Sequence, residues 1–409
     1  MELLNTFTVK EVQEKITKAF QDFPLKTERI PLTEAGNRVL AQDVISYENI
    51  PEFHRSTVDG YGVYYQDTLG ASEGLATYLK KKFTVEMGKE APGKIEPGEC
   101  AYVPTGGMIP EGVNAVVMIE HTEDFDDNTI GIQQSVSDLE NILQKGEDIQ
   151  AGAVVFTKGD RLRTEDIGLL AGLGVTEVRV YQKISVGLIS TGDEIVEIHQ
   201  QPKLGEIRDM NRYSLGAALE RDGFKVVKTA VVKDHRESLE KTLEEFLQTC
   251  DMVLISGGSS MGEKDYTKEV INALGDPGVF VHGVSMKPGK PTIIGKVGKK
   301  AVFGLPGQPV SALMVYEVLV KHLIKLYEKP KMEEPYVIGE MDRNFPSAAG
   351  RAHYFMVSIQ VRNGKNYVTP VYGKSGTLSM MSRAMGYAVI GHNEEGLNKG
   401  DSLRVYPLT

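Results

Sequence analysis

The first strong pattern along the chain is a helical one close to its start. Val12, Ile16 and Phe20 recur at helical spacing and fall on one face. Thr8 stands just before this run and Glu11 follows three residues later, which is the spacing of a capping box. The pattern predicts a short amphipathic helix that begins after Thr8.

Between residues 51 and 140 the pattern changes to short apolar runs. The sequences APG, EPGE, PTGGMIPEG and DFDDN separate these runs, which is typical of small strands joined by turns. Beyond them, a helix capped at Thr164 and closed by Gly174 resumes the pattern of the N-terminus. We therefore predict a discontinuous N-terminal domain, residues 1–50 and 141–181, with a β-rich domain of residues 51–140 inserted in it.

Apolar, β-branched runs dominate from residue 182 onward. ISVGLIS, VVKTAVV, MVLIS and TIIGKV lack alternation, which indicates strands buried on both faces of a parallel sheet. Helical stretches lie between them, the clearest being ESLEKTLEEFLQTC, with Asp234 and Glu237 spaced as N-cap and N3 partner. A long helix ends the region. Alternating strands and helices predict a doubly wound α/β domain over residues 182–328.

The last part of the chain returns to strand patterns. Asn363 and Gly364 form a turn signal between two alternating runs. We predict a C-terminal β domain over residues 329–409. The expected fold class is multidomain α/β plus β, with a central doubly wound α/β domain, a discontinuous N-terminal domain, an inserted β-rich domain and a C-terminal β-barrel-like domain.

Composition and charge narrow the possible partners. A chain of 409 residues predicts several domains, and its net charge of −10 disfavours binding to nucleic acid or to an anionic membrane surface. Cys100 and Cys250 form no metal-binding or disulfide pattern, which fits a reducing compartment. We see no secretory h-region and no apolar run near the ~18 residues of a membrane span. These features predict a cytoplasmic protein.

Glycine-rich turns follow three of the predicted strands. They are Ser-Thr-Gly-Asp-Glu at 190–194, Ser-Gly-Gly-Ser-Ser-Met-Gly at 256–262 and Leu-Pro-Gly-Gln-Pro at 305–309. The carboxyl ends of parallel strands share one edge of a sheet, where glycine lets backbone N–H groups approach an anion. The chain lacks both GxxxxGK[ST] and a strand-associated GxGxxG, so neither a P-loop nor a Rossmann dinucleotide motif is indicated. The turns predict a phosphate site of another kind.

Charged residues near these turns complete the expected site. Lys287 and Lys290, in KPGKP, supply local positive charge, although two solvated lysines in a turn explain this motif equally well. Oxygen-rich sites suit Mg²⁺ bridging a pyrophosphate. The candidate ligands are Asp193, Glu194, Asp234 and Asp265. Helix starts offer alternative explanations for the last two.

A second polar cluster lies in the inserted region. It comprises PEFHRSTVDGYG at 51–62 and PTGG at 104–107, followed by Glu120. Composition indicates only that these are loops. His54 has no partner at metal-ligand spacing, so we expect a hydrogen-bonded loop residue and not a ligand.

Taken in order, these motifs resemble those of the molybdopterin molybdotransferases, the MoeA family to which the gephyrin and plant E-domains belong. The resemblance spans nearly the whole chain and rests on PEFHRSTVDGYG, PTGG with Glu120, KGEDI, STGDE, GEIRDMN, SGGSSMGEKDY, KPGKP, LPGQPVSA and GKSGTLSMMSRA. It implies four domains in an elongated protomer. It also implies a homodimer whose active site lies between the α/β domain of one subunit and the first two domains of the other.

The resemblance further implies a reaction and the residues that perform it. Adenylated molybdopterin is bound, its pyrophosphate is hydrolysed with Mg²⁺, AMP leaves and molybdate is inserted into the dithiolene. The residues expected to be catalytic are Asp59, Thr105, Glu194, Asp234 and Asp265, and the expected metal ligands are Asp193, Glu194, Asp234 and Asp265. Substrate and phosphate binding is expected of Thr191, Gly192, Gly257, Gly258, Ser259, Gly262, Lys287, Lys290, Pro306, Pro309, Asp148, Arg351 and Ser375.

The sequence also departs from the family pattern. Gln308 and Met385 stand where the family usually has Asn, and Leu143 and Gln144 replace a basic stretch. The resemblance implies a molybdopterin adenylyltransferase as the upstream partner. Two other functions stay open: a stand-alone pyrophosphatase or adenylyltransferase, for which residues 183–329 would suffice, and a noncatalytic molybdopterin-binding scaffold or a paralogue with altered oxyanion use.

Overall fold

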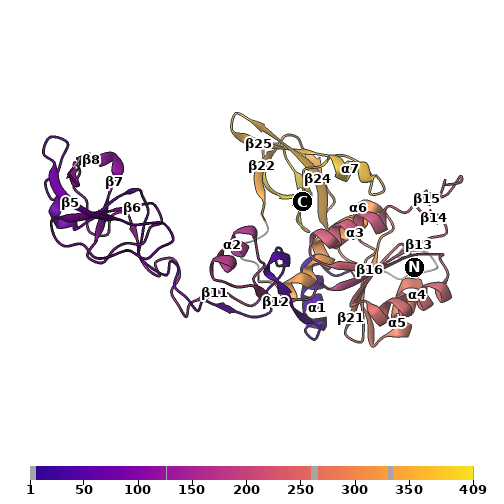
Figure 1. Cartoon of the computed structure of the whole chain (residues 1–409). Coiled ribbons are helices and arrows are strands. Elements are labelled where there is room, and N and C mark those ends of the chain that lie inside the picture. The colour runs from indigo at the N-terminus through magenta and orange to yellow at the C-terminus, as the bar shows by residue number, and fades with distance from the viewer. Residues whose placement is uncertain (1–5, 126, 259–265, 330–334, 409) are drawn as a thin grey trace.

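A computed structural model describes residues 6–125, 127–258, 266–329 and 335–408. Figure 1 shows an elongated chain in which a β-rich body at one end is joined by a narrow stem to the rest. The α/β body lies at the other end, and the C-terminal strands form a third body beside it. Over these described ranges, no helix is both long and apolar enough to cross a membrane.

Helix α1 (Val9–Ala19) begins as the sequence predicts. The Thr8 hydroxyl accepts a hydrogen bond from the Glu11 N–H, and the Glu11 carboxylate accepts one from the Thr8 N–H at 2.7 Å. Val12 and Ile16 are fully buried in the largest hydrophobic cluster of the α/β body. The capping box and the apolar face are therefore confirmed, and they attach the N-terminal helix to the central body.

Segments on either side of the inserted region pair with one another. The pairs are β1 (Thr27–Pro31) with β12 (Glu177–Tyr181), β2 (Val44–Ile45) with β11 (Val154–Phe156), and β3 (Arg55–Ser56) with β10 (Ile142–Leu143). Helix α2 (Thr164–Gly172) lies between β11 and β12 and has Arg163 at its N-cap, so the predicted cap at Thr164 is wrong by one residue. Gly174 follows the helix with a φ of +69°. The discontinuous N-terminal domain is confirmed.

The inserted region is a six-stranded sheet of order β7-β4-β6-β5-β9-β8. Its strands are β4 (Gly60–Val63), β5 (Thr77–Thr84), β6 (Glu99–Val103), β7 (Ala115–Met118), β8 (Thr122–Phe125) and β9 (Thr129–Ile132). Short 3-10 turns are η2 (Tyr65–Thr68) and η3 (Ile119–His121). Val63, Val117 and Ile130 are fully buried in its core. The predicted β-rich insertion is thus present.

The central sheet has the order β16-β13-β17-β21-β20-β18. Its strands are β13 (Ser185–Thr191), β16 (Lys225–Val232), β17 (Met252–Ser256), β18 (Pro277–His282), β20 (Ile293–Val297) and β21 (Lys300–Leu305). Leu188 packs in a cluster with α3 (Asn211–Arg221) and α6 (Pro309–Val315), whereas Ile189 packs with α4 (Arg236–Thr249) and α5 (Tyr266–Leu274). Helices cover both faces, so the sheet is doubly wound.

Two strand predictions in this sheet are wrong in detail. TIIGKV forms β20, which runs antiparallel to β21 and not parallel. The two strands are joined through Gly298 and Lys299, and such a short link makes a hairpin, whereas a parallel pair needs a long crossover. VVKTAVV lies in β16, which is an edge strand whose residues alternate in exposure. Lys225, Val227 and Thr229 are exposed, so one face of the strand meets water.

The C-terminal strands close into a five-stranded barrel, in which β24 and β26 also pair. The strands are β22 (Val337–Met341), β24 (Ala352–Arg362), β25 (Lys365–Pro370), β26 (Gly386–Ile390) and β28 (Ser402–Pro407). Asn363 and Gly364 have φ angles of 50° and 75° between β24 and β25, so the predicted hairpin is confirmed. Helix α7 (Leu378–Arg383) precedes β26. The strand pairs β23 (Phe345–Pro346) with β27 (Gly396–Leu397), and β19 (Met286–Lys287) with β24, complete this body.

The long helix predicted before this body is a composite one. It consists of α6, a π-helical turn η4 (Tyr316–Val320) and a 3-10 segment η5 (Lys321–Leu326). Tyr316 is fully buried, and its hydroxyl donates to the Asp222 carboxylate at 2.8 Å or to the Ala218 carbonyl at 3.0 Å. This contact fixes the composite helix against α3, which faces the same side of the sheet.

Candidate active site

The three glycine-rich turns meet at one edge of the central sheet. Strands β13, β17 and β21 are parallel neighbours, and Ser256 pairs in register with Ser190 on one side and with Leu305 on the other. Each strand ends within one residue of these positions. The turns that follow must therefore leave the sheet side by side, as the sequence pattern implies.

The glycines in the second turn permit a backbone packing that no other residue allows. Gly257 has a φ of +101°, and a β-carbon there would overlap the carbonyl oxygen of Thr191. Gly258 has a φ of +64°, and a β-carbon there would lie 3.0 Å from Thr267 Oγ1. In the third turn, a β-carbon on Gly307 would lie 3.6 Å from the Gly257 Cα. The three turns are therefore in close contact, and the approach of the second turn to the first requires glycine at position 257.

Some of the backbone N–H groups expected to face an anion are already engaged. The Gly192 N–H donates to the Val232 carbonyl, and the Gly257 N–H donates to the Leu305 carbonyl, both at 3.2 Å. At the start of α6, the Val310 N–H donates to the carbonyl of Ser375 at 3.1 Å. The N–H groups of Gly192 and Gly257 therefore join neighbouring strands.

Four buried polar side chains at this edge have atoms without hydrogen-bond partners among the residues described by the structure. They are Ser190 Oγ, Thr191 Oγ1, Thr267 Oγ1 and Asn211 Oδ1, in residues that are at most 8% exposed. Thr191 and Thr267 flank Gly258, whereas Ser190 and Asn211 lie on the α3 side of the sheet. Buried polar groups are normally paired, so this concentration indicates a place where a ligand supplies the partners.

Of these four residues, only Thr191 was predicted as a site residue; Ser190, Asn211 and Thr267 were not. The signal was available, because each is a small polar residue close to a glycine turn or within a quoted motif: Ser190 and Thr191 precede Gly192, and Asn211 ends GEIRDMN. What the sequence could not supply was the pairing state of their atoms. That depends on the distances between segments far apart in the chain.

Three of the expected acidic residues lie together at this edge. The Asp193 carboxylate accepts a hydrogen bond from the Asp234 N–H at 3.3 Å, and the Lys233 ammonium group donates to the Asp193 carbonyl at 2.8 Å. A β-carbon on Gly192 would lie 2.7 Å from Glu194 Oε2, so this carboxylate folds back over the first turn. The loops after β13 and β16 thus bring carboxylates to the glycine turns.

The alternative explanation of Asp234 as a helix cap is wrong. Helix α4 begins at Arg236, with His235 at the N-cap and no capping hydrogen bond from its side chain. A β-carbon on Gly258 would lie 3.9 Å from Asp234 Oδ1, which places this carboxylate beside the second turn. Asp234 is therefore oriented toward the candidate site by its position one residue before the cap.

Three predicted site residues, Ser259, Gly262 and Asp265, lie outside the described residues. Within the described ranges, no three or more His, Cys, Asp or Glu side chains are grouped as a metal cage would require. The described carboxylates therefore supply at most a partial set of metal ligands.

Basic residues lie where the central sheet meets the C-terminal barrel. Lys287, in β19, pairs in register with His353 of β24, and both Lys287 and Lys290 are exposed. His353 is buried, and its ring nitrogen Nδ1 lies 2.9 Å from the Ser347 hydroxyl. Burial, and then the charges of Lys287 and Arg351, lower the pKa of His353 to about 4. The lowered pKa of His353 thus shows that the positive charges of Lys287 and Arg351 act near its imidazole ring.

The C-terminal motif GKSGTLSMMSRA contacts the third glycine turn. The Ser375 hydroxyl donates to the Gln308 side-chain carbonyl oxygen. Its backbone carbonyl also accepts from Val310, while Pro309 occupies the first turn of α6. Gln308, which departs from the family pattern, therefore links the barrel to the third glycine turn. This turn follows β21 and contains Pro306.

The residues expected from the inserted region form a separate group. Asp59 Oδ1 accepts a hydrogen bond from the Thr105 N–H at 2.8 Å, and both residues are exposed. Asp148 lies in the stem, where its N–H donates to the Ile50 carbonyl at 3.0 Å. His54 Nδ1 accepts from the Lys145 N–H at 3.2 Å, which confirms it as a hydrogen-bonded loop residue.

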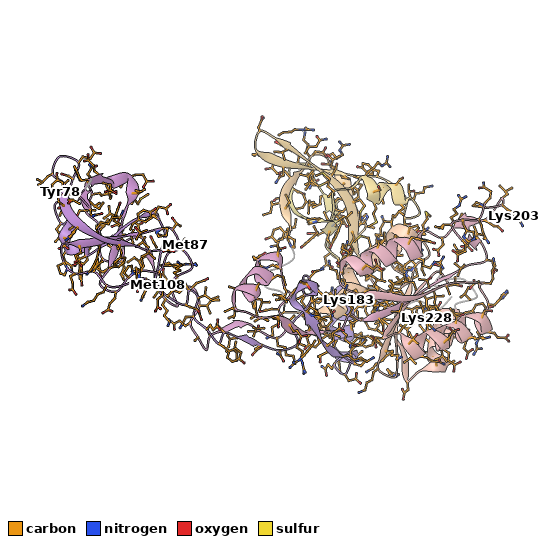
Figure 2. The ribbon with its side chains drawn as sticks, viewed as in Figure 1. Tyr78, Met87, Met108, Lys183, Lys203 and Lys228 are labelled. Atoms are coloured by element: carbon orange, nitrogen blue, oxygen red, sulfur yellow. The ribbon has the colours of Figure 1, made fainter. Side chains whose placement is uncertain are left out.

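A single chain does not bring the two groups together. Figure 2 shows Met108, close in sequence to Thr105, on the body at one end, and Lys203 and Lys228 on the α/β body at the other. Asp59 directly precedes β4 and Thr105 follows β6 in that distant body, whereas the glycine turns belong to the central sheet. Any site that uses both groups needs more than one copy of this chain.

Comparisons with known proteins match nearly the whole chain. Three protein-family models match: the MoeA N-terminal region (domain I and II) at residues 7–174, a probable molybdopterin binding domain at 187–326, and the MoeA C-terminal region (domain IV) at 339–408. The chain is 36% identical over 334 residues to the molybdopterin molybdenumtransferase of Haemophilus influenzae, covering 81% of each chain. The protein of the same name from Staphylococcus epidermidis is 28% identical, with coverage of 97% and 94%.

A solved structure shows the same fold over the full length. The molybdopterin biosynthesis MoeA protein of Pyrococcus horikoshii OT3 superposes with a TM-score of 0.82 at 30% identity, covering 98% of this chain and all of that one. These matches extend through every region described above. The chain belongs to the MoeA family and is an enzyme of the transferase class.

Proposed function

We propose that this protein acts in molybdenum cofactor biosynthesis by inserting molybdate into adenylated molybdopterin, with hydrolysis of the pyrophosphate and release of AMP. The observation that carries the proposal is the meeting of three glycine turns and three carboxylates at one sheet edge. Relatives that carry the name molybdopterin molybdenumtransferase support the choice of substrate. Molybdate and the nucleotide are substrates, and Mg²⁺ is the one proposed cofactor.

The carboxylates at the sheet edge fit Mg²⁺ bound in a particular way. This ion dehydrates reluctantly and is usually held by one or two carboxylates together with substrate phosphates and water. Asp193 and Asp234 lie beside one another and Glu194 is close to the same turn, although no closed cage of three is formed by the described residues. Mg²⁺, when bound, neutralises charge on the diphosphate. Asp265 is proposed as a further ligand on the family resemblance alone.

The side chains of the protein have defined tasks in this proposal. Thr191 and Thr267, whose hydroxyls are unpaired among the described residues, donate to phosphate oxygens at this sheet edge. Such prearranged donors stabilise charge as it develops. Glu194 and Asp234 orient the attacking water. Lys287, Lys290 and Arg351 attract the incoming oxyanion, since the charges of Lys287 and Arg351 act in one region beside His353 and Lys290 follows in the same exposed turn.

In this proposal the protein is a homodimer, and the residues of the distant inserted body take part in the same reaction in the partner subunit. Asp59 and Thr105 from one subunit would complete the site formed by the turns of the other, with Asp148 of the stem beside them. The separation of the two groups within one chain supports this arrangement. Oligomers of this kind are commonly closed two-fold dimers, which would contain two equivalent sites.

The remaining assignments complete the proposal. The protein acts in the cytoplasm and receives its substrate from a molybdopterin adenylyltransferase. It is divided into residues 1–50 with 141–181, residues 51–140, residues 182–328 and residues 329–409. A stand-alone pyrophosphatase would not need the Asp59–Thr105 pair, and a scaffold would not need the unpaired hydroxyls.

The proposal is tested by incubating the full chain with adenylated molybdopterin, molybdate and Mg²⁺. We expect AMP release together with active cofactor, and we expect Asp234→Ala to lose both by at least a hundredfold, on the order of effects seen when charge-stabilising groups are removed. Lys183→Ala, an exposed substitution on the same body, is the matched control. Undetectable AMP release by the wild-type protein would contradict the proposal.

A further inference from the structure

Asn211 is the first residue of α3 and lies beneath the second and third glycine turns. Its side-chain nitrogen Nδ2 donates to the Ser256 hydroxyl at 2.5 Å and to the Gly307 carbonyl at 2.8 Å. A carbonyl oxygen can only accept, so the contact with Gly307 determines that the amide nitrogen faces the turns. The amide oxygen then faces away from both.

That oxygen has no partner among the described residues. Asn211 is 8% exposed, and its Oδ1 atom has no hydrogen bond to any residue in the part of the chain that the structure describes. A buried acceptor left unpaired destabilises the folded protein. An unpaired acceptor at a ligand-binding edge has a physical explanation if a bound ligand donates the missing hydrogen bond.

The donor cannot come from the phosphates of the proposed ligand. Ionised phosphate oxygens only accept hydrogen bonds, as does the amide oxygen of Asn211. The remaining parts of adenylated molybdopterin include two amino-bearing rings, adenine and the pterin, whose exocyclic amino groups donate. An amide oxygen pairs well with such a group, as in the recognition of adenine by Asn.

We propose that Asn211 is a specificity-determining residue that accepts a hydrogen bond from the exocyclic amino group of a bound heterocycle. The inference rests on the proposed function, since it assigns one part of that ligand to the α3 side of the sheet edge. The amide nitrogen binds Ser256 and Gly307 in the two turns, while the amide oxygen accepts the hydrogen bond from the ring's amino group. Ser190, also unpaired and on the same side, lies next to Ser256 in the sheet and offers a second polar contact.

The test uses paired probes in which a carbonyl replaces the exocyclic amino group. AMP is compared with IMP, and pterin with lumazine, because each second compound has a carbonyl oxygen where the first has the amino group. Dissociation constants are measured by calorimetry for the wild-type protein and for Asn211→Ala. We expect one pair to differ roughly tenfold in the wild type and by about onefold in the variant, as the loss of one buried hydrogen bond predicts. The pair that responds identifies the ring.

A purely structural role for Asn211 gives a different result. Loss of the link between the turns would weaken both members of a pair alike and leave their ratio unchanged, which would overturn the proposal. Equal binding of amino and carbonyl compounds by the wild type would overturn it without any variant, so the test stands even if Asn211→Ala does not fold. Failure of the wild type to bind any probe, or Mg²⁺ with pyrophosphate, would instead contradict the proposed function.

Discussion

Gly257 lies so close to Thr191 that a β-carbon on the glycine would overlap the threonine carbonyl oxygen. This contact joins the turns after β17 and β13, and the Thr191 methyl group and the Thr267 hydroxyl both lie about Gly258 in the second turn. The arrangement of the turns thus depends on the absence of one side chain.

Gly257→Ala is expected to abolish binding of the nucleotide with only a moderate loss of stability. The φ of +101° costs an alanine about 1–2 kcal/mol, and the overlap forces the two turns apart. Urea unfolding and calorimetry with AMP measure the two effects separately. Gly298→Ala is the matched control, because its φ is +60° but nothing lies within 4 Å of the added carbon. Wild-type affinity in Gly257→Ala would contradict the close packing.

Substitutions of Asp59 separate its charge from its hydrogen bond. Asp59→Asn can still accept the hydrogen bond from the Thr105 N–H, whereas Asp59→Ala cannot. We expect both variants to lose turnover about a hundredfold if the charge is needed, but only Asp59→Ala to loosen the turn. Amide exchange at Thr105 reports the turn, and AMP release reports turnover. Full activity of Asp59→Asn would show that the carboxylate only holds the loop.

The stability of the protein is expected to fall as the pH is lowered from about 6.5 to about 4, partly because of His353. Its pKa is about 4 in the folded protein and ordinary in the unfolded chain, so the unfolded chain holds the extra proton within this window. The stabilisation is complete above the unfolded value and is reduced by about 2 kcal/mol at pH 5. Urea unfolding of wild type and His353→Gln at pH 7 and pH 5 measures this, and equal losses in both proteins would argue against it.

Lys287→Gln is expected to raise the pKa of His353, because the lysine charge is one of the causes that lower it. Lys290→Gln should leave that pKa unchanged, which makes it the control within the same motif. Titration followed by NMR measures the imidazole directly. We expect Lys287→Gln also to weaken oxyanion binding by roughly tenfold, as the loss of one charge-assisted contact predicts. An unchanged pKa of His353 in Lys287→Gln would mean that the lysine does not lie beside the imidazole.

Much of the fold could be predicted because its signals are local. The capping box at Thr8 and Glu11 and the hairpin at Asn363 and Gly364 depend on residues a few positions apart, and both are present. The predicted direction of β20 was wrong, because a buried apolar run has the same sequence pattern whether its strand is parallel or antiparallel to its neighbour. Only the short link through Gly298 distinguishes them.

The site was less predictable for a related reason. Glycines after strands signal a shared edge, since strand direction alone places their ends together. The unpaired oxygen of Asn211 depends on contacts with Ser256 and Gly307, which are 45 and 96 residues away. No spacing rule contains that information. The same holds for Asp234. The sequence allowed it to be the N-cap of α4, and only the observed start of this helix at Arg236 excludes that role.

The most direct test of the central claim mixes two inactive variants. Asp59→Ala removes a residue of the inserted body and Asp234→Ala one of the central body, so neither variant alone should release AMP. After the purified variants are dissociated, mixed in equal amounts and reassociated, half of the dimers contain one intact site, and about a quarter of wild-type activity should return. If the mixture stays as inactive as its components while dimers exchange, the two groups do not form one shared site.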